Sequence, residues 1–239
     1  MEAILFDWDG TLADTLGVIY RANVEVMTAL GLPFDQALYR RHFAPDWRVM
    51  YERLGVPVDR LEEANSRWWA ALDAADTVLF PGVRDALERL AAAGHPLGIV
   101  TAGRSDRVGA ELRLHGIDGL FGVVVYGDDG PAQKPDPAPL RAALAALGRA
   151  ERAASSVYVG DTPDDMRMAV AAGVGAVGIE SVLGDAAELR AAGAIETAPT
   201  AVEWVERRLG QQRFDPSRSG PPKSDLPRSD PRIDRSSAG

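Results

Sequence analysis

The strongest constraint on the fold is a regular alternation of short apolar runs with helix-forming segments between residue 83 and about residue 205. Short apolar runs bounded by turn-forming residues predict buried strands, and the longer segments between them, several ending in glycine, predict helices. Strands that alternate with helices form a parallel sheet covered on both faces, so we expect an α/β fold. The expected strands are 3–6, 96–101, 123–126, 156–159 and 176–179, and the expected helices are 83–94, 105–116, 137–148, 162–173, 184–192 and 199–209.

Residues 15–80 interrupt this alternation, because their pattern predicts helices and no strand. The expected helical segments are 16–30, 34–54 and 58–75. A helical insertion after the first strand accounts for this most economically, with Pro81-Gly82 marking the return to the sheet. We therefore expect a core domain formed by residues 1–14 and 81–210, and an all-helical domain formed by residues 15–80.

The last segment, residues 211–239, is rich in Pro, Ser, Arg, Asp and Gly and has few apolar side chains. Such a segment buries too little surface to offset the entropy lost on ordering, so a disordered tail is expected. The whole chain carries a net charge of −9, which disfavours nucleic acid as a partner. It contains no cysteine, no apolar stretch long enough to span a membrane and no visible secretory signal, so a cytoplasmic protein without membrane contact is expected.

Polar side chains follow several of the expected strands. Asp7 and Asp9 follow the first strand, Thr101 the second, Lys134 the third and Asp161 the fourth. The carboxyl ends of parallel strands meet at one edge of the sheet, so we expect these side chains to converge. Neighbouring carboxylates repel each other unless a cation lies among them, and hard oxygen ligands suit Mg²⁺. The hydroxyl and the ammonium are donors for phosphate oxygens, so the pattern indicates a phosphoryl-transfer site.

Two observations decide how much weight these residues carry. Asp-x-Asp-Gly taken alone is more typical of a turn than of an active site. Lys134, however, is the only lysine among residues 1–210, where every other basic side chain apart from histidine is arginine. A compact ammonium kept at the end of a strand favours a specific contact with phosphate.

The four ordered segments 7–11, 101, 134–135 and 160–165 resemble the four motifs of the haloacid dehalogenase (HAD) superfamily over about residues 1–205. The helical insertion resembles the cap of its phosphoglycolate phosphatase-like branch. The resemblance implies a Rossmann-like parallel sheet with helices on both faces and an inserted all-helical cap domain.

The resemblance also implies a role for each site residue. Asp7 would be the nucleophile that forms an aspartyl-phosphate, and Asp9 the general acid and then base, with its main-chain carbonyl on Mg²⁺. Thr101 and Lys134 would hold the phosphoryl group. Asp161 would ligate the metal. Further contacts are implied for the backbone N–H of Ala102, on the phosphoryl group, and for Asp165, on the metal or a metal-bound water.

Asp165 has a second interpretation. Thr162-x-x-Asp165, with Pro163 at the first helical position, matches a capping box. Metal binding and helix capping are compatible, and both remain open.

The choice among activities rests on two positions. HAD dehalogenases lack the second aspartate of the first motif, so Asp9 favours phosphate chemistry. Sugar-phosphate mutases of this branch carry a histidine where this chain has Ile19. We therefore expect a Mg²⁺-dependent phosphatase acting on a small phosphorylated metabolite, as a monomer or homodimer. The alternatives are a pyrophosphatase, a sugar-phosphate mutase of the same superfamily, or a non-catalytic binding module.

Substrate choice is expected to depend on the helical cap. Arg40, Arg41, Arg48 and Arg53 cluster there, and one of them would suit a substrate carboxylate or second phosphate, although a solvated helix face is the more ordinary interpretation. Trp68-Trp69 is expected to pack within the cap.

Overall fold

The computed structural model describes residues 1–73 and 76–213. The predicted disordered tail falls mainly on 214–239, outside the described residues. Helix α10 (Ala201–Arg213) includes the first three residues of the segment 211–239 that composition assigned to the tail. None of the helices described is both long and apolar enough to cross a membrane.

The centre of the molecule is a six-stranded sheet in the order β3-β2-β1-β4-β5-β6, with every pair of neighbouring strands parallel. The strands are β1 (Ile4–Phe6), β2 (Leu97–Val100), β3 (Val123–Val125), β4 (Val157–Gly160), β5 (Gly175–Ile179) and β6 (Glu196–Ala198). The first five confirm the expected strands, and the predicted α/β class is correct. Strand β6 was not expected, because its Glu-Thr-Ala sequence has no apolar run.

Helices cover both faces of the sheet because successive residues of each strand point to opposite sides. On one side Ile4, Phe6 and Ile99 belong to a core that also contains residues of α5 and α10. On the other side Leu5 and Tyr158 pack with residues of α7, α8 and α9. The helices outside the insertion are α5 (Val83–Ala92), α6 (Ser105–Leu114), α7 (Ala138–Ala146), α8 (Pro163–Ala172), α9 (Ala186–Ala191) and the longer α10.

The inserted segment forms α1 (Leu16–Leu30), α2 (Gln36–His42), α3 (Trp47–Arg53) and α4 (Leu61–Asp73), with a short 3-10 turn at Val58–Arg60. The single helical segment expected at 34–54 is two helices. Pro45 removes a backbone N–H, and its ring disfavours helical backbone at the preceding residue. The Asp46 carboxylate then accepts the backbone N–H of Arg48 at 2.9 Å and starts α3.

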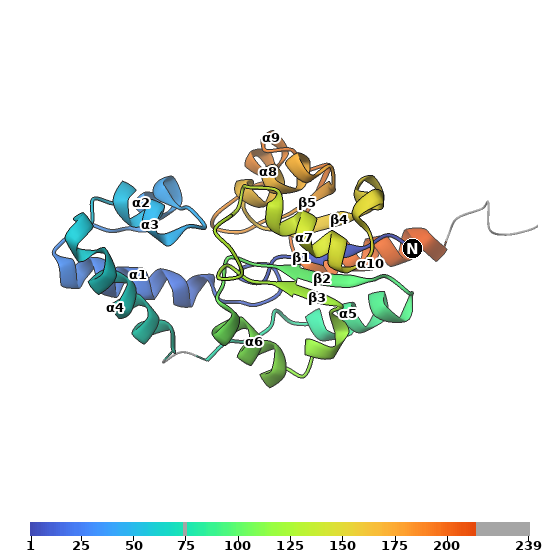
Figure 1. Cartoon of the computed structure of the whole chain (residues 1–239), viewed down its shortest axis with the longest axis horizontal. Helices are drawn as coiled ribbons and strands as arrows, with labels where there is room; N and C mark the ends of the chain where they lie inside the picture. The colour runs from blue at the N-terminus through green and yellow to red at the C-terminus, as the bar shows by residue number, and fades with distance from the viewer. Residues whose placement is uncertain (74–75, 214–239) are drawn as a thin grey trace, which may run out of the picture.

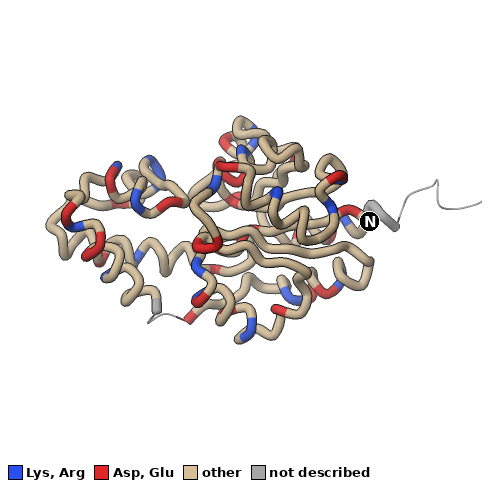
Figure 2. Tube along the Cα trace, viewed as in Figure 1, with Lys and Arg blue, Asp and Glu red and all other residues tan. Residues whose placement is uncertain are grey.

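These four helices have a core of their own, formed around Val26, Met27, Tyr39 and Tyr51. Figure 1 shows these helices beyond one end of the sheet, the end toward which β1 runs from the N-terminus. The carboxyl ends of the strands therefore face the inserted helices. Figure 2 shows acidic and basic residues interspersed over both parts of the molecule. The division into core and cap domains remains a prediction.

Candidate active site

The loops at the carboxyl ends of the strands bring the predicted site residues together. Asp7 directly follows β1, Thr101 follows β2 and Asp161 follows β4, while Lys134 lies in the loop between β3 and α7. The side chains of all four are buried, although each is polar or charged. Buried polar groups require partners: Asp7 and Lys134 contact each other, and Thr101 accepts a backbone N–H, whereas the Asp161 carboxylate has no hydrogen-bond partner.

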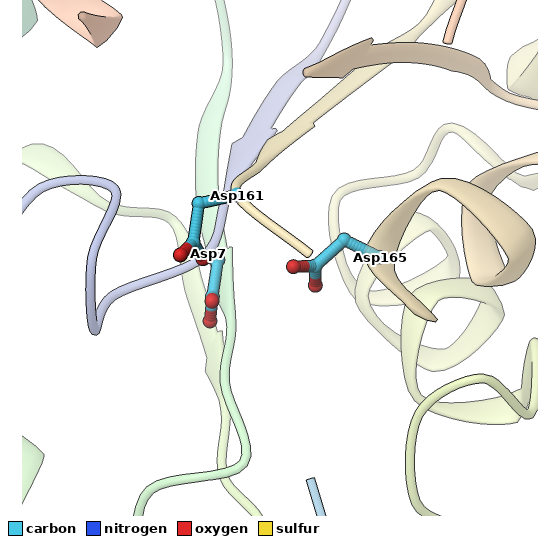
Figure 3. A group of neighbouring side chains, drawn as sticks. All are labelled: Asp7, Asp161 and Asp165. Carbon is cyan, nitrogen blue, oxygen red and sulfur yellow. The ribbon is translucent and has the colours of Figure 1, made fainter. Parts of the chain in front are cut away.

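Three of the carboxylates form a compact acidic cluster. Asp7, Asp161 and Asp165 each offer an oxygen within 4.8 Å of the others. Figure 3 shows the Asp165 side chain, from α8, extending toward the two aspartates that follow β1 and β4. Neither carboxylate oxygen of Asp161 has a hydrogen-bond partner, although this side chain is fully buried. A buried carboxylate with two free oxygens beside two more carboxylates fits a hard divalent cation.

The backbone of Gly10 makes room for this cluster. Its φ of +79° lies in the left-handed region, and an added Cβ would lie 2.5 Å from the Asp161 carboxylate. Glycine is therefore required here both for its conformation and for the close approach of Asp161.

Lys134 is the only cation in direct contact with the cluster among the described residues. Its Nζ lies 2.7 Å from Asp7 Oδ1 and 2.8 Å from Asp165 Oδ1. The lysine side chain is 4% exposed, so these two contacts are shielded from water and salt. With all three carboxylates ionised, one ammonium leaves a net negative charge, which a bound cation would offset.

Asp165 caps α8 and also belongs to the acidic cluster. The Thr162 hydroxyl accepts the Asp165 N–H, and Asp165 Oδ2 accepts the Thr162 N–H at 3.0 Å, so the expected capping box is present. Its other oxygen, Oδ1, accepts from Lys134 and lies 3.2 Å from the Tyr158 hydroxyl. The capping contacts therefore aim the carboxylate at the cluster.

The Asp9 carboxylate is bound by residues that lie outside the four sequence motifs. Its carboxylate forms a two-pronged ion pair with Arg107 of α6, with Nη1 3.0 Å from Oδ1, and accepts the Thr15 hydroxyl at 2.7 Å. Arg107 also contacts Glu111 at 3.2 Å, and Glu111 accepts the Trp8 indole N–H at 2.6 Å. The i, i+4 spacing of Arg107 and Glu111 was the available signal, but that spacing is more typical of an exposed helix face.

Thr101 and Ala102 occupy the loop between β2 and α6. Both line the cavity that contains Asp7 and Lys134. The Thr101 Oγ accepts the backbone N–H of Gly103 at 3.0 Å. A Cβ at Gly103 would lie 2.6 Å from Arg107 Nη2, so this glycine lets the guanidinium reach Asp9.

Burial and charge shift the pKa values of the cluster in a consistent way. Burial, reinforced by Asp165, raises the pKa of Asp7 from 3.8 to about 7 despite the nearby Lys134. Burial, then Asp7 and Asp165, raises the pKa of Asp161 well above its ordinary value. Burial alone would lower the pKa of Lys134, but the two carboxylates it contacts outweigh burial and raise it. Burial opposes ionisation of Asp9 too, yet Arg107 outweighs it and holds the Asp9 pKa below its ordinary value.

These shifts predict that Asp161→Asn stabilises the metal-free protein. An unfolded Asp161 ionises near 3.8, whereas the folded site resists ionisation, so its penalty on folding grows as the pH rises above that value. We expect the melting temperature in EDTA to rise by about 3–8 °C at about pH 8, and by less at about pH 5. The matched control is Asp164→Asn, since Asp164 pairs at 2.7 Å with the exposed Arg167. A lower melting temperature for Asp161→Asn at both pH values would contradict this interpretation.

Comparison with known proteins adds an independent result. A family model described as haloacid dehalogenase-like hydrolase matches residues 4–179. A phosphoglycolate phosphatase from Yersinia pestis is 32% identical over 189 residues, which cover 75% of this chain and 81% of the relative. CbbY from Rhodobacter sphaeroides, solved in complex with phosphate, is 27% identical with a TM-score of 0.69, covering 85% of this chain and 96% of that one. A hydrolase from Pseudomonas syringae, 24% identical, shares the fold with a TM-score of 0.77 over 88% of this chain and 99% of its own.

Proposed function

The chain belongs to the haloacid dehalogenase-like hydrolase family, and we therefore propose that it is a Mg²⁺-dependent phosphatase hydrolysing a small phosphomonoester through an aspartyl-phosphate. It would be a phosphatase of the general kind that its phosphoglycolate phosphatase relatives represent. The observation that carries the proposal is the buried acidic cluster of Asp7, Asp161 and Asp165 with Lys134 against it. Carboxylates, a metal and a cation around one position are the parts that phosphoryl transfer needs.

Asp7 is the nucleophile in this proposal. Lys134 contacts its Oδ1, which leaves Oδ2 to attack phosphorus as the bond to the leaving oxygen breaks. Lys134, the Thr101 hydroxyl and the Ala102 N–H hold the phosphoryl oxygens. The carboxylates of Asp7, Asp161 and Asp165 and the main-chain carbonyl of Asp9 would hold the Mg²⁺, which would supply Lewis-acid stabilisation of charge on those oxygens.

Asp9 transfers the protons. It gives a proton to the leaving alkoxide, and later takes one from the water that hydrolyses the aspartyl-phosphate. The contact with Arg107 favours the carboxylate form of Asp9, which is the form that the second step requires. The first step requires protonated Asp9, so the ion pair between Arg107 and Asp9 must weaken when substrate binds.

A phosphate-release assay tests the proposed function. With Mg²⁺ present, we expect release from at least one ester in a panel of small phosphorylated metabolites, falling about 100-fold or more in EDTA and returning when Mg²⁺ is restored. The panel includes pyrophosphate and a hexose 1-phosphate, so that pyrophosphatase and mutase activities give different products. Release that persists in EDTA would contradict the metal site. No product from any member would favour the binding module.

A further inference from the structure

A small cavity lies between the acidic cluster and the inserted helices. Its volume is about 130 Å³, and it is lined on the sheet side by Asp7, Asp9, Thr101 and Lys134. Its opposite wall consists mostly of apolar and aromatic side chains: Ile19, Phe43, Trp47, Met50, Trp68 and Trp69. An apolar cavity of about 150 Å³ accommodates a benzene ring. The phosphoryl group would occupy the sheet side of this volume, so the remainder suits no more than one small ring or alkyl group. Trp68 and Trp69 line the cavity as well as packing within the cap.

Three deeply buried polar side chains interrupt this apolar wall. Tyr39 and Tyr51 are each 1% exposed and Asn23 is fully buried, and all three line the cavity. Neither tyrosine hydroxyl has a hydrogen-bond partner, nor does the Asn23 side-chain oxygen, and the buried indole N–H of Trp68 in the same wall also lacks one. A buried polar group without a partner costs about 1–3 kcal/mol, so several of them beside one cavity point to a ligand that supplies partners.

These groups are uncharged. Burial, with Asp161 and Asp9 adding to it, raises the pKa of Tyr39, and burial raises that of Tyr51, so both remain neutral phenols. Neutral hydroxyls and an amide recognise hydroxyl or amide groups of a ligand. They do not compensate a buried negative charge.

The cations that line the cavity are already paired with carboxylates. Among the lining residues described, they are Lys134, which contacts Asp7 and Asp165, and Arg107, which contacts Asp9 and Glu111. The Arg107 Nε–H is buried without a partner and can donate to a ligand oxygen. A substrate carboxylate there would be a third anion around a single cation.

The cap arginines considered from the sequence do not supply the cavity with a further cation that could pair with a substrate carboxylate. None of Arg40, Arg41, Arg48 and Arg53 is among the described residues that line the cavity. Arg40 reaches across to Glu188 of α9, and Arg48 pairs with Glu62 of α4. Arg53 donates to the backbone carbonyl of Phe43.

We propose that the alcohol released from the substrate is uncharged, with a small ring or alkyl group and a hydroxyl or amide, rather than a carboxylate such as glycolate. This substrate class rests on the proposed phosphatase function. The Yersinia pestis relative is named for phosphoglycolate, which releases the carboxylate glycolate, so the proposed substrate class differs from the one in that name.

Two matched pairs of esters test the substrate class with the full chain and Mg²⁺. The first pair is 2-hydroxyethyl phosphate and 2-phosphoglycolate, and the second is benzyl phosphate and 4-carboxybenzyl phosphate. We expect kcat/KM to be about tenfold or more higher for the uncharged member of each pair. Equal values, or higher values for the carboxylates, would overturn the substrate class and leave the phosphatase proposal standing. No phosphate release from any of the four would overturn the phosphatase proposal, and this inference with it.

A double variant tests the polar groups themselves. Tyr39→Phe with Tyr51→Phe keeps both rings and removes both hydroxyls. We expect kcat/KM for 2-hydroxyethyl phosphate to fall about fivefold or more beyond any fall for ethyl phosphate, which lacks the hydroxyl. A purely structural effect would lower both values equally, and that result would overturn recognition by the tyrosines.

Discussion

Replacing Asp7 with asparagine is expected to lower kcat by about 10⁴-fold or more while the protein stays folded. An amide has nearly the same shape as a carboxylate, but it is not a nucleophile toward phosphorus, so no aspartyl-phosphate forms. The fold should tolerate the change, because burial and Asp165 already raise the pKa of Asp7 to about 7. Removing this charge relieves repulsion within the cluster at neutral pH. The measurements are phosphate release and thermal unfolding monitored by circular dichroism.

The matched control for this variant is Asp14→Asn. Asp14 lies in the loop that follows β1, as Asp7 does, but its side chain is exposed and it is not among the residues that line the catalytic cavity. It should keep kcat within about twofold of the unmodified protein. Near-normal turnover by Asp7→Asn would contradict the covalent mechanism. Loss of structure in that variant would contradict the account of the cluster's charge.

The sequence predicted the sheet well because its first five strands are apolar on both faces. A strand buried on both sides needs an uninterrupted apolar run, which stands out against amphipathic helices. Strand β6 begins with the polar residues Glu196 and Thr197, so it lacks that signal. The break between α2 and α3 was signalled by Pro45 and Asp46, and the helical pattern on either side concealed it.

The site residues at strand ends were predictable because one rule of parallel sheets brings them together. Asp7, Thr101 and Asp161 needed only the strand positions to be correct. Arg107 lay outside that rule. Arg107 is one of many arginines in the chain, and only the packed structure shows that its side chain turns inward to Asp9. The unpartnered hydroxyls of Tyr39 and Tyr51 were equally invisible, since they depend on how the inserted helices pack over the sheet edge.

Lys134→Met is expected to have the largest effect on stability of any single substitution at the site. Methionine keeps most of the length of the side chain and removes the ammonium that contacts Asp7 at 2.7 Å and Asp165 at 2.8 Å. Breaking a buried ion pair leaves uncompensated charge and costs about 3–5 kcal/mol. At about 2–4 °C per kcal/mol for a chain of this size, the melting temperature should fall by about 6–20 °C near pH 8 in EDTA. Phosphate release should fall as well, because the phosphoryl group loses its lysine contact.

The pH dependence of that loss separates charge from packing. Lys134 opposes the rise in the pKa of Asp7, so its removal raises that pKa above the present value of about 7. Below this pKa Asp7 binds a proton and its part of the uncompensated charge disappears, so the deficit in melting temperature should shrink near pH 5. A deficit that is the same at both pH values would instead indicate lost packing around the lysine stem.

An exposed ion pair provides the control for Lys134→Met. Arg167→Met also removes one cation from one aspartate, but Arg167 is 58% exposed where Lys134 is 4% exposed. Water already solvates the Arg167–Asp164 pair, so its loss should cost under about 1 kcal/mol and depend little on pH. Equal losses for the two variants would mean that burial does not set the strength of the Lys134 contacts. The interpretation of Asp7, Asp161 and Asp165 as a buried acidic cluster that needs a cation would then also be wrong.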